Sequence, residues 1–399
     1  MQIDSEAHLT YCSNIHPAET WLDTFQNIKS YTLTIKKRLN RKLFGVGLRL
    51  SNRASLELLE GCKLDLFKNW LLENDLYVFT VNGFPYGQFH GTKVKDAVHL
   101  PDWSTRERLD YTKRLFTILA GLLPQGMDGG VSTSPITYKH WHSTDQLVQV
   151  KKTAVKQLVA LIVFLAQLKR ETGKNLHLDM EPEPDGLLET SGEFIGFFDR
   201  IINEGAVQVA LELGIDKSTA GKVIQDHFQL CLDVCHFAVG FEVPSEVIRS
   251  ISAAGIGIGR IQISAALGSQ NMVGKENIEK VRQEMRLFNE PTYLHQAVIS
   301  STNGIRRYKD LGPALDSLME GDEEIRTHFH VPVFTGNYNG LLSTQKDIID
   351  TLDIWKKNRF TQHLEVETYT WEVLPKNLRT SLVDSIVREL KWVEKYLKI

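Results

Sequence analysis

Asp233 and His236 form a motif whose residue types and spacing suit metal binding. They lie in Phe228–Phe237, which reads FQLCLDVCHF. The first part of this stretch alternates apolar and polar residues as a strand does, and Asp233 falls where that strand should end. A carboxylate and an imidazole three residues apart at a strand exit could bind one metal ion. The alternative for this motif alone is an ion-paired aspartate and a hydrogen-bonded core histidine.

Five further segments repeat the same alternation of apolar and polar residues. In Asn175–Glu181, for example, His177, Asp179 and Glu181 share one parity and apolar residues take the other. A strand covered by helices on both faces would be apolar nearly throughout. One polar face on strand after strand therefore predicts a barrel whose outside meets helices and whose inside opens into a polar site. The five segments are Tyr77–Asn82, Asn175–Glu181, Arg260–Ser264, Arg326–Val331 and His363–Glu367.

The exits of the strands bring polar side chains to one mouth of this predicted barrel. Carboxylates from separate strands, together with one or two imidazoles, form a ligand set suited to a divalent metal ion. A buried ion-pair network around Arg49 and Arg260 is the alternative. The residues expected at the mouth are His16, Arg49, Asn82, Glu181, Asp233, His236, Gln262, His330 and Glu367.

Helical segments separate the strands, and their order predicts the architecture. Strands at His8–Asn14 and Leu43–Leu50 precede the others and bring their number to eight. This order predicts an α/β fold, a (β/α)8 TIM barrel, with its site at the carboxyl ends of the strands. Gly129–Tyr138 is interpreted as a short extended insert outside this count. No linker or internal repeat divides the chain, so we expect residues 1–399 to form a single domain.

Two long segments are expected to lie over the mouth of the barrel. Gly83–Trp103 follows the third strand, and Leu294–Lys309 is a basic segment interpreted as a second insertion or lid. Long insertions at strand exits commonly cover a site. His90, in the first of these segments, is a candidate substrate contact.

The composition is that of an ordinary globular protein. The 399 residues are 42% hydrophobic and 24% charged with a net charge of −3, which gives no electrostatic case for nucleic acid or an anionic membrane. The longest apolar run, Leu158–Ala166, is too short to span a bilayer, so no membrane insertion is expected. The N-terminus, MQIDSEAHL, lacks the regions of a signal peptide. Four cysteines without a CxxC spacing favour a reduced, cytoplasmic protein.

These strand exits resemble those of the xylose-isomerase-like barrels, which include sugar isomerases, epimerases and endonuclease-IV-type enzymes. The motifs that carry the resemblance are Glu181 after the fourth strand, Asp233-x-x-His236 after the fifth, His328-x-His330 at the seventh and Glu367 at the eighth. More closely, the stretches TYCSNIHPAETW, TVNGFPYGQFHG, LDMEPEPDG, CLDVCHFAVGFE and HFHVPVF resemble EboE. EboE is a metabolite-traffic family from a bacterial gene cluster associated with moving secondary-metabolite precursors.

The resemblance implies a role for each of these residues. It implies that Glu181, Asp233 and Glu367 bind a divalent metal ion (Mn, Mg or Zn), with His236 and His330 completing the site. It also implies that Glu181 and Glu367 transfer protons beside a substrate carbonyl. The expected substrate-binding residues are His16, Arg49, Asn82, His90, Gln262 and His328.

Four strands depart from the pattern of the relatives. The sixth strand has Gln262 where relatives usually supply a histidine. The seventh reads His328-Phe329-His330 where Asp-x-His is common. Arg49 and Asn82 stand where trinuclear zinc phosphodiesterases need histidines, which counts against endonuclease-type chemistry.

We therefore expect a metal-dependent, isomerase- or epimerase-like protein that acts on a small polyhydroxylated or carbonyl metabolite. The alternative is a non-catalytic protein that binds or delivers such a metabolite, which the missing sixth-strand histidine favours. Metal-dependent hydrolysis ranks below both. Other proteins of the same gene cluster are further partners that the resemblance implies.

Overall fold

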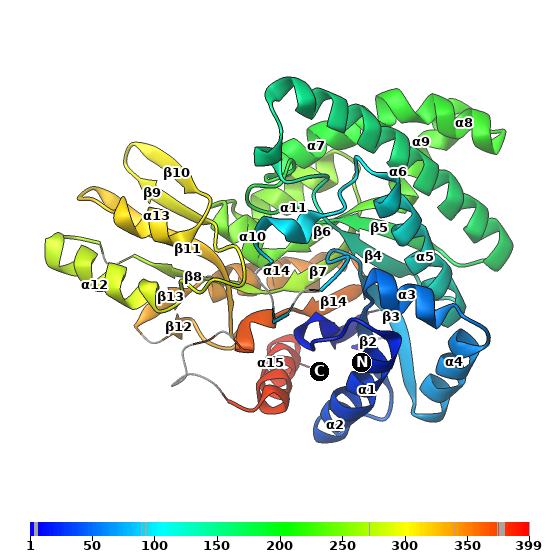
Figure 1. Cartoon of the computed structure of the whole chain (residues 1–399), viewed down its shortest axis with the longest axis horizontal. Coiled ribbons are helices and arrows are strands. Elements are labelled where there is room, and N and C mark those ends of the chain that lie inside the picture. The colour runs from blue at the N-terminus through cyan, green and yellow to red at the C-terminus, as the bar shows by residue number, and fades with distance from the viewer. Residues whose placement is uncertain are drawn as a thin grey trace.

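Eight parallel strands form a barrel in the order β1-β14-β7-β6-β5-β4-β3-β2. A parallel bridge between Cys12 and Gly47 brings the first and last of these together, so the barrel is nearly closed. The computed structural model describes residues 1–3, 7–88, 90–91, 94–270, 272–338, 340–372, 374 and 380–398. The predicted (β/α)8 fold is confirmed (Figure 1). The barrel strands are β1 (His8–Tyr11), β2 (Phe44–Arg49), β3 (Leu76–Asn82), β4 (Gly129–Thr133), β5 (Leu176–Met180), β6 (Phe228–Asp233), β7 (Ile258–Ile263) and β14 (His363–Val366).

Helices cover the outside of the barrel (Figure 1). The longest, α6 (Thr144–Thr172), begins at a capping box between Ser143 and Gln146 and ends at Gly173, whose φ is 71°. Its apolar stripe is buried, as its 3.6-residue periodicity requires. The other helices around the barrel are α1 (Trp21–Asn27), α2 (Leu33–Arg38), α3 (Asn52–Leu58), α4 (Lys63–Glu73), α5 (Arg106–Leu122), α7 (Ser191–Arg200), α8 (Ala206–Leu213), α9 (Lys217–His227), α10 (Val234–Val239), α11 (Pro244–Ala253), α14 (Gln345–Asn358) and α15 (Leu382–Leu397).

The fourth barrel strand is one that the sequence interpretation had set aside. Gly129–Tyr138 was expected to be an insert, but its first half is β4, which pairs in parallel with both β3 and β5. The expectation was wrong because β4 lacks the polar alternation of its neighbours. A Cβ at Gly130 would overlap the carboxylate of Asp179, so the strand can present no side chain there.

A second sheet replaces the expected seventh barrel strand. Asp322–Val331 (β11), which contains Arg326–Val331, pairs antiparallel with β8 (Ala265–Ser269) and β9 (Ala297–Ser301) and lies outside the barrel. The predicted lid Leu294–Lys309 is likewise not irregular, since β9 and β10 (Gly304–Tyr308) form a hairpin within it. The remaining parts of this sheet and its helices are β12 (Asn337–Tyr338), β13 (Leu341–Ser343), α12 (Lys275–Arg286) and α13 (Leu311–Asp316).

The second sheet grows directly out of the barrel. Only Ser264 separates β7 from β8, so the chain leaves the barrel mouth and continues into the sheet, which Figure 1 shows in yellow-green to orange beside the barrel. Alternation alone could not assign β11 to one sheet or the other, because a strand with one polar face suits both.

A layer of charged side chains fills the middle of the barrel below its mouth. The Arg260 guanidinium donates to Asp179 Oδ2 at 2.9 Å and to Glu365 Oε2 at 3.1 Å, and all three side chains are fully buried. A Cβ at Gly47 or Gly259 would overlap these carboxylates. The ion-pair network that the sequence offered as an alternative to a metal site therefore exists around Arg260, one layer below the strand exits.

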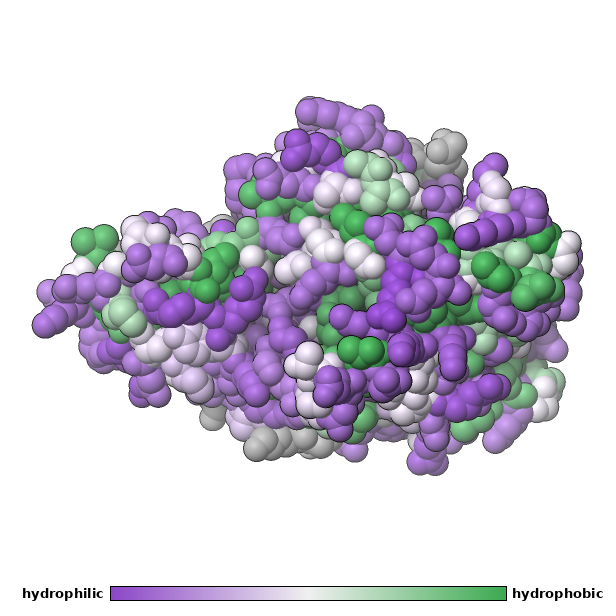
Figure 2. All heavy atoms as spheres, turned by 90° about the horizontal axis from the view of Figure 1, so that it is seen from above, coloured by the Kyte–Doolittle hydropathy of each residue, from purple (hydrophilic) through white to green (hydrophobic). Residues whose placement is uncertain are grey.

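The surface is of mixed polarity. The face seen in Figure 2 is mostly hydrophilic, with hydrophobic side chains in scattered groups. Of the helices in the described part of the chain, none has the length and apolar character needed to cross a membrane.

Candidate metal centre

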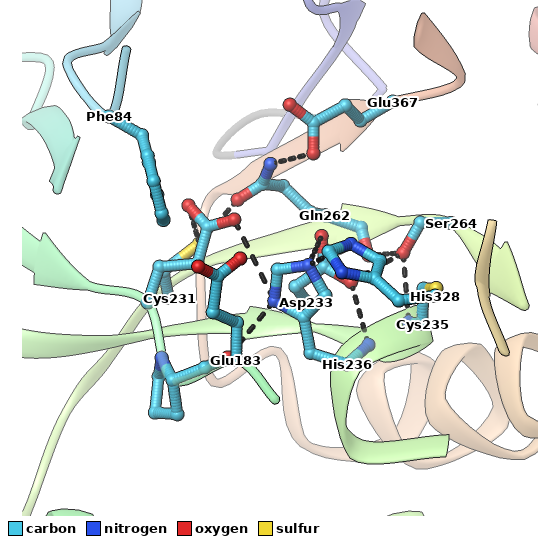
Figure 3. A network of polar contacts seen from close by, with 12 residues as sticks. Phe84, Glu183, Cys231, Asp233, Cys235, His236, Gln262, Ser264, His328 and Glu367 are labelled. Atoms are coloured by element: carbon cyan, nitrogen blue, oxygen red, sulfur yellow. Dashed lines mark hydrogen bonds and ion pairs between the residues drawn. The ribbon is translucent and has the colours of Figure 1, made fainter. Parts of the chain in front are cut away.

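Three carboxylates meet where β5, β6 and β14 leave the barrel. Glu181 follows β5 directly, Asp233 is the last residue of β6, and Glu367 follows β14 directly. A ligand oxygen from each lies within 4.8 Å of the other two, and all three side chains are buried. We call these three residues the carboxylate centre. Figure 3 shows Asp233 and Glu367 of this group, with Gln262 between the two.

Amide side chains fix Glu367. Asn14 and Asn82 donate to its Oε1 at 2.6 and 3.2 Å, and the Gln262 amide donates to Oε2. The amide oxygen of Gln262 in turn accepts from the thiol of Cys231. Gln262 therefore orients a carboxylate from the position where relatives supply a histidine.

Asp233 keeps one oxygen without a hydrogen bond. Its Oδ1 accepts from Ser264 Oγ at 2.8 Å and from the His236 backbone N–H at 3.1 Å, which also caps α10. Its Oδ2 is buried and has no hydrogen-bond partner in the described part of the chain. An unpaired carboxylate oxygen in the interior is costly, so a group that binds it is needed.

The pKa values of the centre reflect this crowding. Burial, and then the neighbouring charges of Glu367 and Asp233, raise the pKa of Glu181 well above its usual range. Burial and the charges of Asp233 and Glu365 do the same to the pKa of Glu367. A divalent cation would relieve the charge repulsion that adds to both pKa shifts, and oxygen ligands from carboxylates suit Mg²⁺ or Mn²⁺. The residues present therefore fit such an ion.

Three imidazoles, which we call the imidazole group, lie beside the carboxylate centre. His236 is in α10, and His328 and His330 are on β11, so two of them come from the second sheet and not from a barrel strand. The ring of His236 is 4.6 Å from that of His328 and 6.0 Å from that of His330. Burial lowers the pKa of all three, which favours the neutral form that binds metals.

The expected ligands thus form two groups that share Asp233: the carboxylate centre, and Asp233 with His236 and His330. Ligand atoms of Asp233, His236 and His330 lie within 4.8 Å of one another, as do those of the carboxylate centre. His330 Nδ1 lies 2.7 Å from the Glu367 carbonyl oxygen, and its Nε2 has no hydrogen-bond partner among the described atoms.

A cavity of about 60 Å³ opens onto both groups. Of the predicted site residues, Asn82, Glu181, His236, His328 and Glu367 line it. Both long segments contribute to its walls, the first through Phe84 and the turn Lys95–His99, although residues 89, 92 and 93 of that segment lie outside the described part of the chain. The lining residues that the sequence interpretation missed include Asn14, His99, Glu183, Tyr293, Gln296 and Tyr369.

Position at a strand exit was the signal that could have identified some of these missed residues. Asn14 ends the first predicted strand, and Glu183 stands two residues beyond Glu181 in Pro182-Glu183-Pro184. His99, Tyr293 and Gln296 lie in long connections, where the sequence gives no such position.

Four predicted substrate contacts lie behind the cavity wall. The Arg49 guanidinium donates to the carbonyl oxygens of Ala18 and Gly87. The ring of His16 stacks on that of Tyr31, with 4.2 Å between the ring centroids. His90 contacts the Asn14 carbonyl oxygen at 2.5 Å and the Tyr293 hydroxyl at 2.9 Å, and so supports two lining residues. The Gln262 amide donates to Glu367 from behind the cavity lining. These four side chains therefore support the residues that line the cavity and do not line it themselves.

Comparisons with known proteins bear on the fold. No protein-family model and no curated protein matches the chain. Among solved structures it is similar to an IOLI protein with a binding zinc atom, at 12% identity over 98% of both chains and a TM-score of 0.49. It is also similar to a xylose isomerase-like TIM barrel protein from Mycobacterium smegmatis in complex with magnesium, at 10% identity over 100% of this chain and 98% of that one, with a TM-score of 0.49. A D-tagatose 3-epimerase-like protein is a third, at 10% identity over 98% and 97% of the two chains, again with a TM-score of 0.49. These likenesses concern the barrel, which the strand pairing establishes, and say nothing of this chain's substrate.

Proposed function

We propose that the carboxylate centre binds a divalent metal ion and that the protein isomerises or epimerises a small polyhydroxylated or carbonyl metabolite. The observation that supports this most is the convergence of Glu181, Asp233 and Glu367 in one buried space. The fully buried cation below them, Arg260, is already bonded to Asp179 and Glu365. A bound cation is therefore the group that would satisfy the three carboxylates, with His330 as a nitrogen ligand on the Asp233 side.

Glu181 and Glu367 would have different duties in this reaction. Three amides hold Glu367, which suits a ligand with a fixed direction. Glu181 is held much less: its Oε2 lies 3.7 Å from the Cys231 thiol and its Oε1 lies 3.9 Å from His236 Nδ1. We assign proton transfer at the carbon beside the substrate carbonyl mainly to Glu181, which lines the cavity and has the freedom to reach it.

The metal ion would supply polarisation of the substrate carbonyl oxygen. In its presence the pKa of Glu181 would fall from the raised value that burial causes, so that the carboxylate could accept a proton near neutral pH. The lining rings of Phe84, Tyr293 and Tyr369 would exclude water from the exchanging proton.

The cavity limits the size of the substrate. About 60 Å³ holds a few water molecules, so a sugar-sized molecule enters only if the covering segments move. The turn Lys95–His99 is attached to the second sheet's side of the site, since Val94 and Lys95 both donate backbone N–H groups to the Thr292 carbonyl oxygen. We propose that this connection opens for substrate entry.

A binding protein without catalysis is the second candidate, and Gln262 favours it. Its amide occupies Glu367 Oε2, an oxygen that an enzyme of this type would offer to the metal ion. The EboE resemblance points to a secondary-metabolite precursor as the bound molecule, and to other proteins of that gene cluster as partners. A cytoplasmic location belongs to the same proposal.

Deuterium exchange separates the two candidates. The purified, metal-loaded chain is incubated in D₂O with a panel of neutral ketoses and cyclic polyol ketones, and deuterium at the carbon beside the carbonyl is measured by mass spectrometry. An enzyme introduces deuterium, and Glu181→Gln abolishes the exchange while the metal remains bound. Binding of a panel member without any exchange contradicts the enzyme and supports the binder.

Metal titration tests the centre itself. Isothermal calorimetry with Mn²⁺ should show binding to the parent chain and none to a chain carrying both Glu181→Gln and Glu367→Gln. Glu365→Gln, in the Arg260 layer, is the matched control and should still bind. Equal affinity of the parent and the double variant would refute the proposed centre.

A further inference from the structure

Two imidazoles of the site face one another with their Nε2 atoms. His236 Nε2 and His328 Nε2 are 3.1 Å apart, and both side chains are buried. One of the two nitrogens would have to carry a hydrogen for this contact to be a hydrogen bond. The partners of the Nδ1 atoms decide whether either does.

Both Nδ1 atoms carry the ring hydrogen. His236 Nδ1 lies 3.0 Å from the Pro182 carbonyl oxygen, which can only accept. His328 Nδ1 lies 2.9 Å from Gln296 Oε1. The orientation of that amide is set by its own Nε2, which donates to the Pro184 carbonyl oxygen at 2.9 Å.

A neutral imidazole with its hydrogen on Nδ1 has a lone pair on Nε2. His236 and His328 therefore direct two lone pairs at each other, an arrangement that needs a cation between them. The hydroxyl of Tyr369 is 3.5 Å from His328 Nε2, which is longer than an effective O–H···N bond.

The spacing of the two nitrogens suits a shared metal ion. Zinc binds imidazole at about 2.0–2.1 Å, so two nitrogens in its tetrahedral shell are about 3.3 Å apart. Ring N–H groups committed to carbonyl or amide oxygens are also typical of metal-binding histidines, because that bond fixes the tautomer and the ring direction.

Glu183 completes the ligand set. A carboxylate oxygen of Glu183 and a nitrogen of each of His236 and His328 lie within 4.8 Å of one another. Glu183 Oε1 is 2.8 Å from His99 Nε2, a close contact that lacks the geometry of a hydrogen bond. Figure 3 shows Glu183, His236 and His328 together, and all three line the cavity.

We infer that Glu183, His236 and His328 form a second metal site, for a transition-metal ion such as Zn²⁺ or Co²⁺, with its remaining coordination positions open to the cavity. Two imidazoles and one carboxylate select such ions over Mg²⁺. The ligands are separate from the carboxylate centre, so this site does not depend on the proposed function. Where both sites are filled, a substrate oxygen in the cavity meets two cations.

Cobalt titration tests the second site. The purified chain is stripped with a chelator and titrated with Co²⁺ under visible absorption, and bound cobalt is counted by elemental analysis. We expect two equivalents, of which one gives the intense visible bands of four- or five-coordinate cobalt with two imidazole ligands, whereas the oxygen-rich carboxylate centre, with one imidazole, gives only the weak bands of six-coordinate cobalt. His328→Asn should remove the intensely absorbing equivalent.

Controls distinguish this site from the carboxylate centre. His227→Asn removes another buried histidine, whose Nδ1 is bonded to the Leu176 carbonyl oxygen away from the cavity, and should bind as the parent does. Loss of only the weakly absorbing equivalent in Glu367→Gln would support both sites. If the parent binds a single cobalt equivalent, and that equivalent gives the intense bands, the proposed carboxylate centre is refuted and the second site is supported.

A measurement on the parent chain covers the case in which His328→Asn does not fold. With ¹⁵N-labelled histidine, Zn²⁺ should shift the Nε2 resonances of His236 and His328 and leave their Nδ1–H signals in place. A single equivalent without the intense bands would overturn the second site. So would an Nε2 proton shared by the pair at pH 7.5 that zinc does not displace.

Discussion

Glu389 gives the chain a pH-dependent stability that can be worked out from its surroundings. This residue of α15 is buried, and its Oε1 accepts from Thr368 Oγ1 at 2.7 Å and from the Val333 N–H at 3.2 Å. It therefore holds the segment that follows Glu367 against the segment that follows His330. Burial raises the pKa of Glu389 from its usual 4.5 to about 8.

The sign of the effect follows from the two pKa values. Below pH 4.5 the group is protonated in both the folded and unfolded chains, and its contribution to stability is fully present. As the pH rises the unfolded chain releases the proton first, so the free energy of unfolding falls until the folded chain also releases it near pH 8. Between about pH 6 and pH 8.5 the loss is about 2.5 kcal/mol, at 1.36 kcal/mol per unit of pKa difference.

Glu389→Gln should remove this loss. Glutamine retains an oxygen that can accept both hydrogen bonds and has no proton to release, so the variant should be the more stable chain at pH 8.5. Urea unfolding of the two chains at both pH values measures the difference. Glu394→Gln is the control on the same helix: its carboxylate binds Arg41 at 2.6 Å, and its loss should leave the pH dependence unchanged. If the parent and Glu389→Gln lose stability in parallel over this range, the buried-acid explanation is wrong.

Three further predictions concern the barrel interior and the carboxylate centre. Arg260→Met leaves Asp179 and Glu365 buried without their cation and should lower the free energy of unfolding by about 3–5 kcal/mol in urea, whereas Arg53→Met, at an exposed pair with Glu57, should cost under about 1 kcal/mol. Similar losses for the two would show that the Arg260 layer does not stabilise the barrel. Asn14→Ala and Asn82→Ala each remove one of the two amide donors to Glu367 Oε1 and should each weaken Mn²⁺ binding by about 10–100-fold in calorimetry; unchanged affinity would mean that the amides do not orient the ligand. Gln262→His places an imidazole beside Glu367 and should tighten Zn²⁺ binding in competition with a chelator, and equal or weaker binding would contradict the metal site there.

Alternation of polar and apolar residues was enough to predict the barrel and most of its mouth. Glu181, Asp233 and Glu367 were predicted together because each directly ends or follows a strand whose apolar parity is clear. The carboxyl ends of parallel strands meet at one edge, so their convergence followed from topology alone.

The errors have a common physical origin. β4 was missed because the side chain of Asp179 fills the space in front of Gly130, so a neighbour's residue, and not its own, supplies the polar interior there. β11 was misplaced because its alternation serves an antiparallel sheet as well as a barrel. Glu183 and His99 were missed because a proline-rich exit and a long loop carry no periodicity from which direction could be predicted.

Ser264, the residue between β7 and β8, links the second sheet to the metal centre through a hydrogen bond. The Ser264 hydroxyl donates to Asp233 Oδ1, and it accepts the Cys235 N–H at 2.9 Å, while the backbone on either side of Ser264 belongs to two different sheets. A protein that binds the second sheet and shifts β8 would move Ser264 and, through its hydrogen bond, Asp233. Asp233 is the ligand shared by the carboxylate centre and the group with His236 and His330. Metal affinity could then respond to an event some distance outside the barrel, with no ligand entering the cavity.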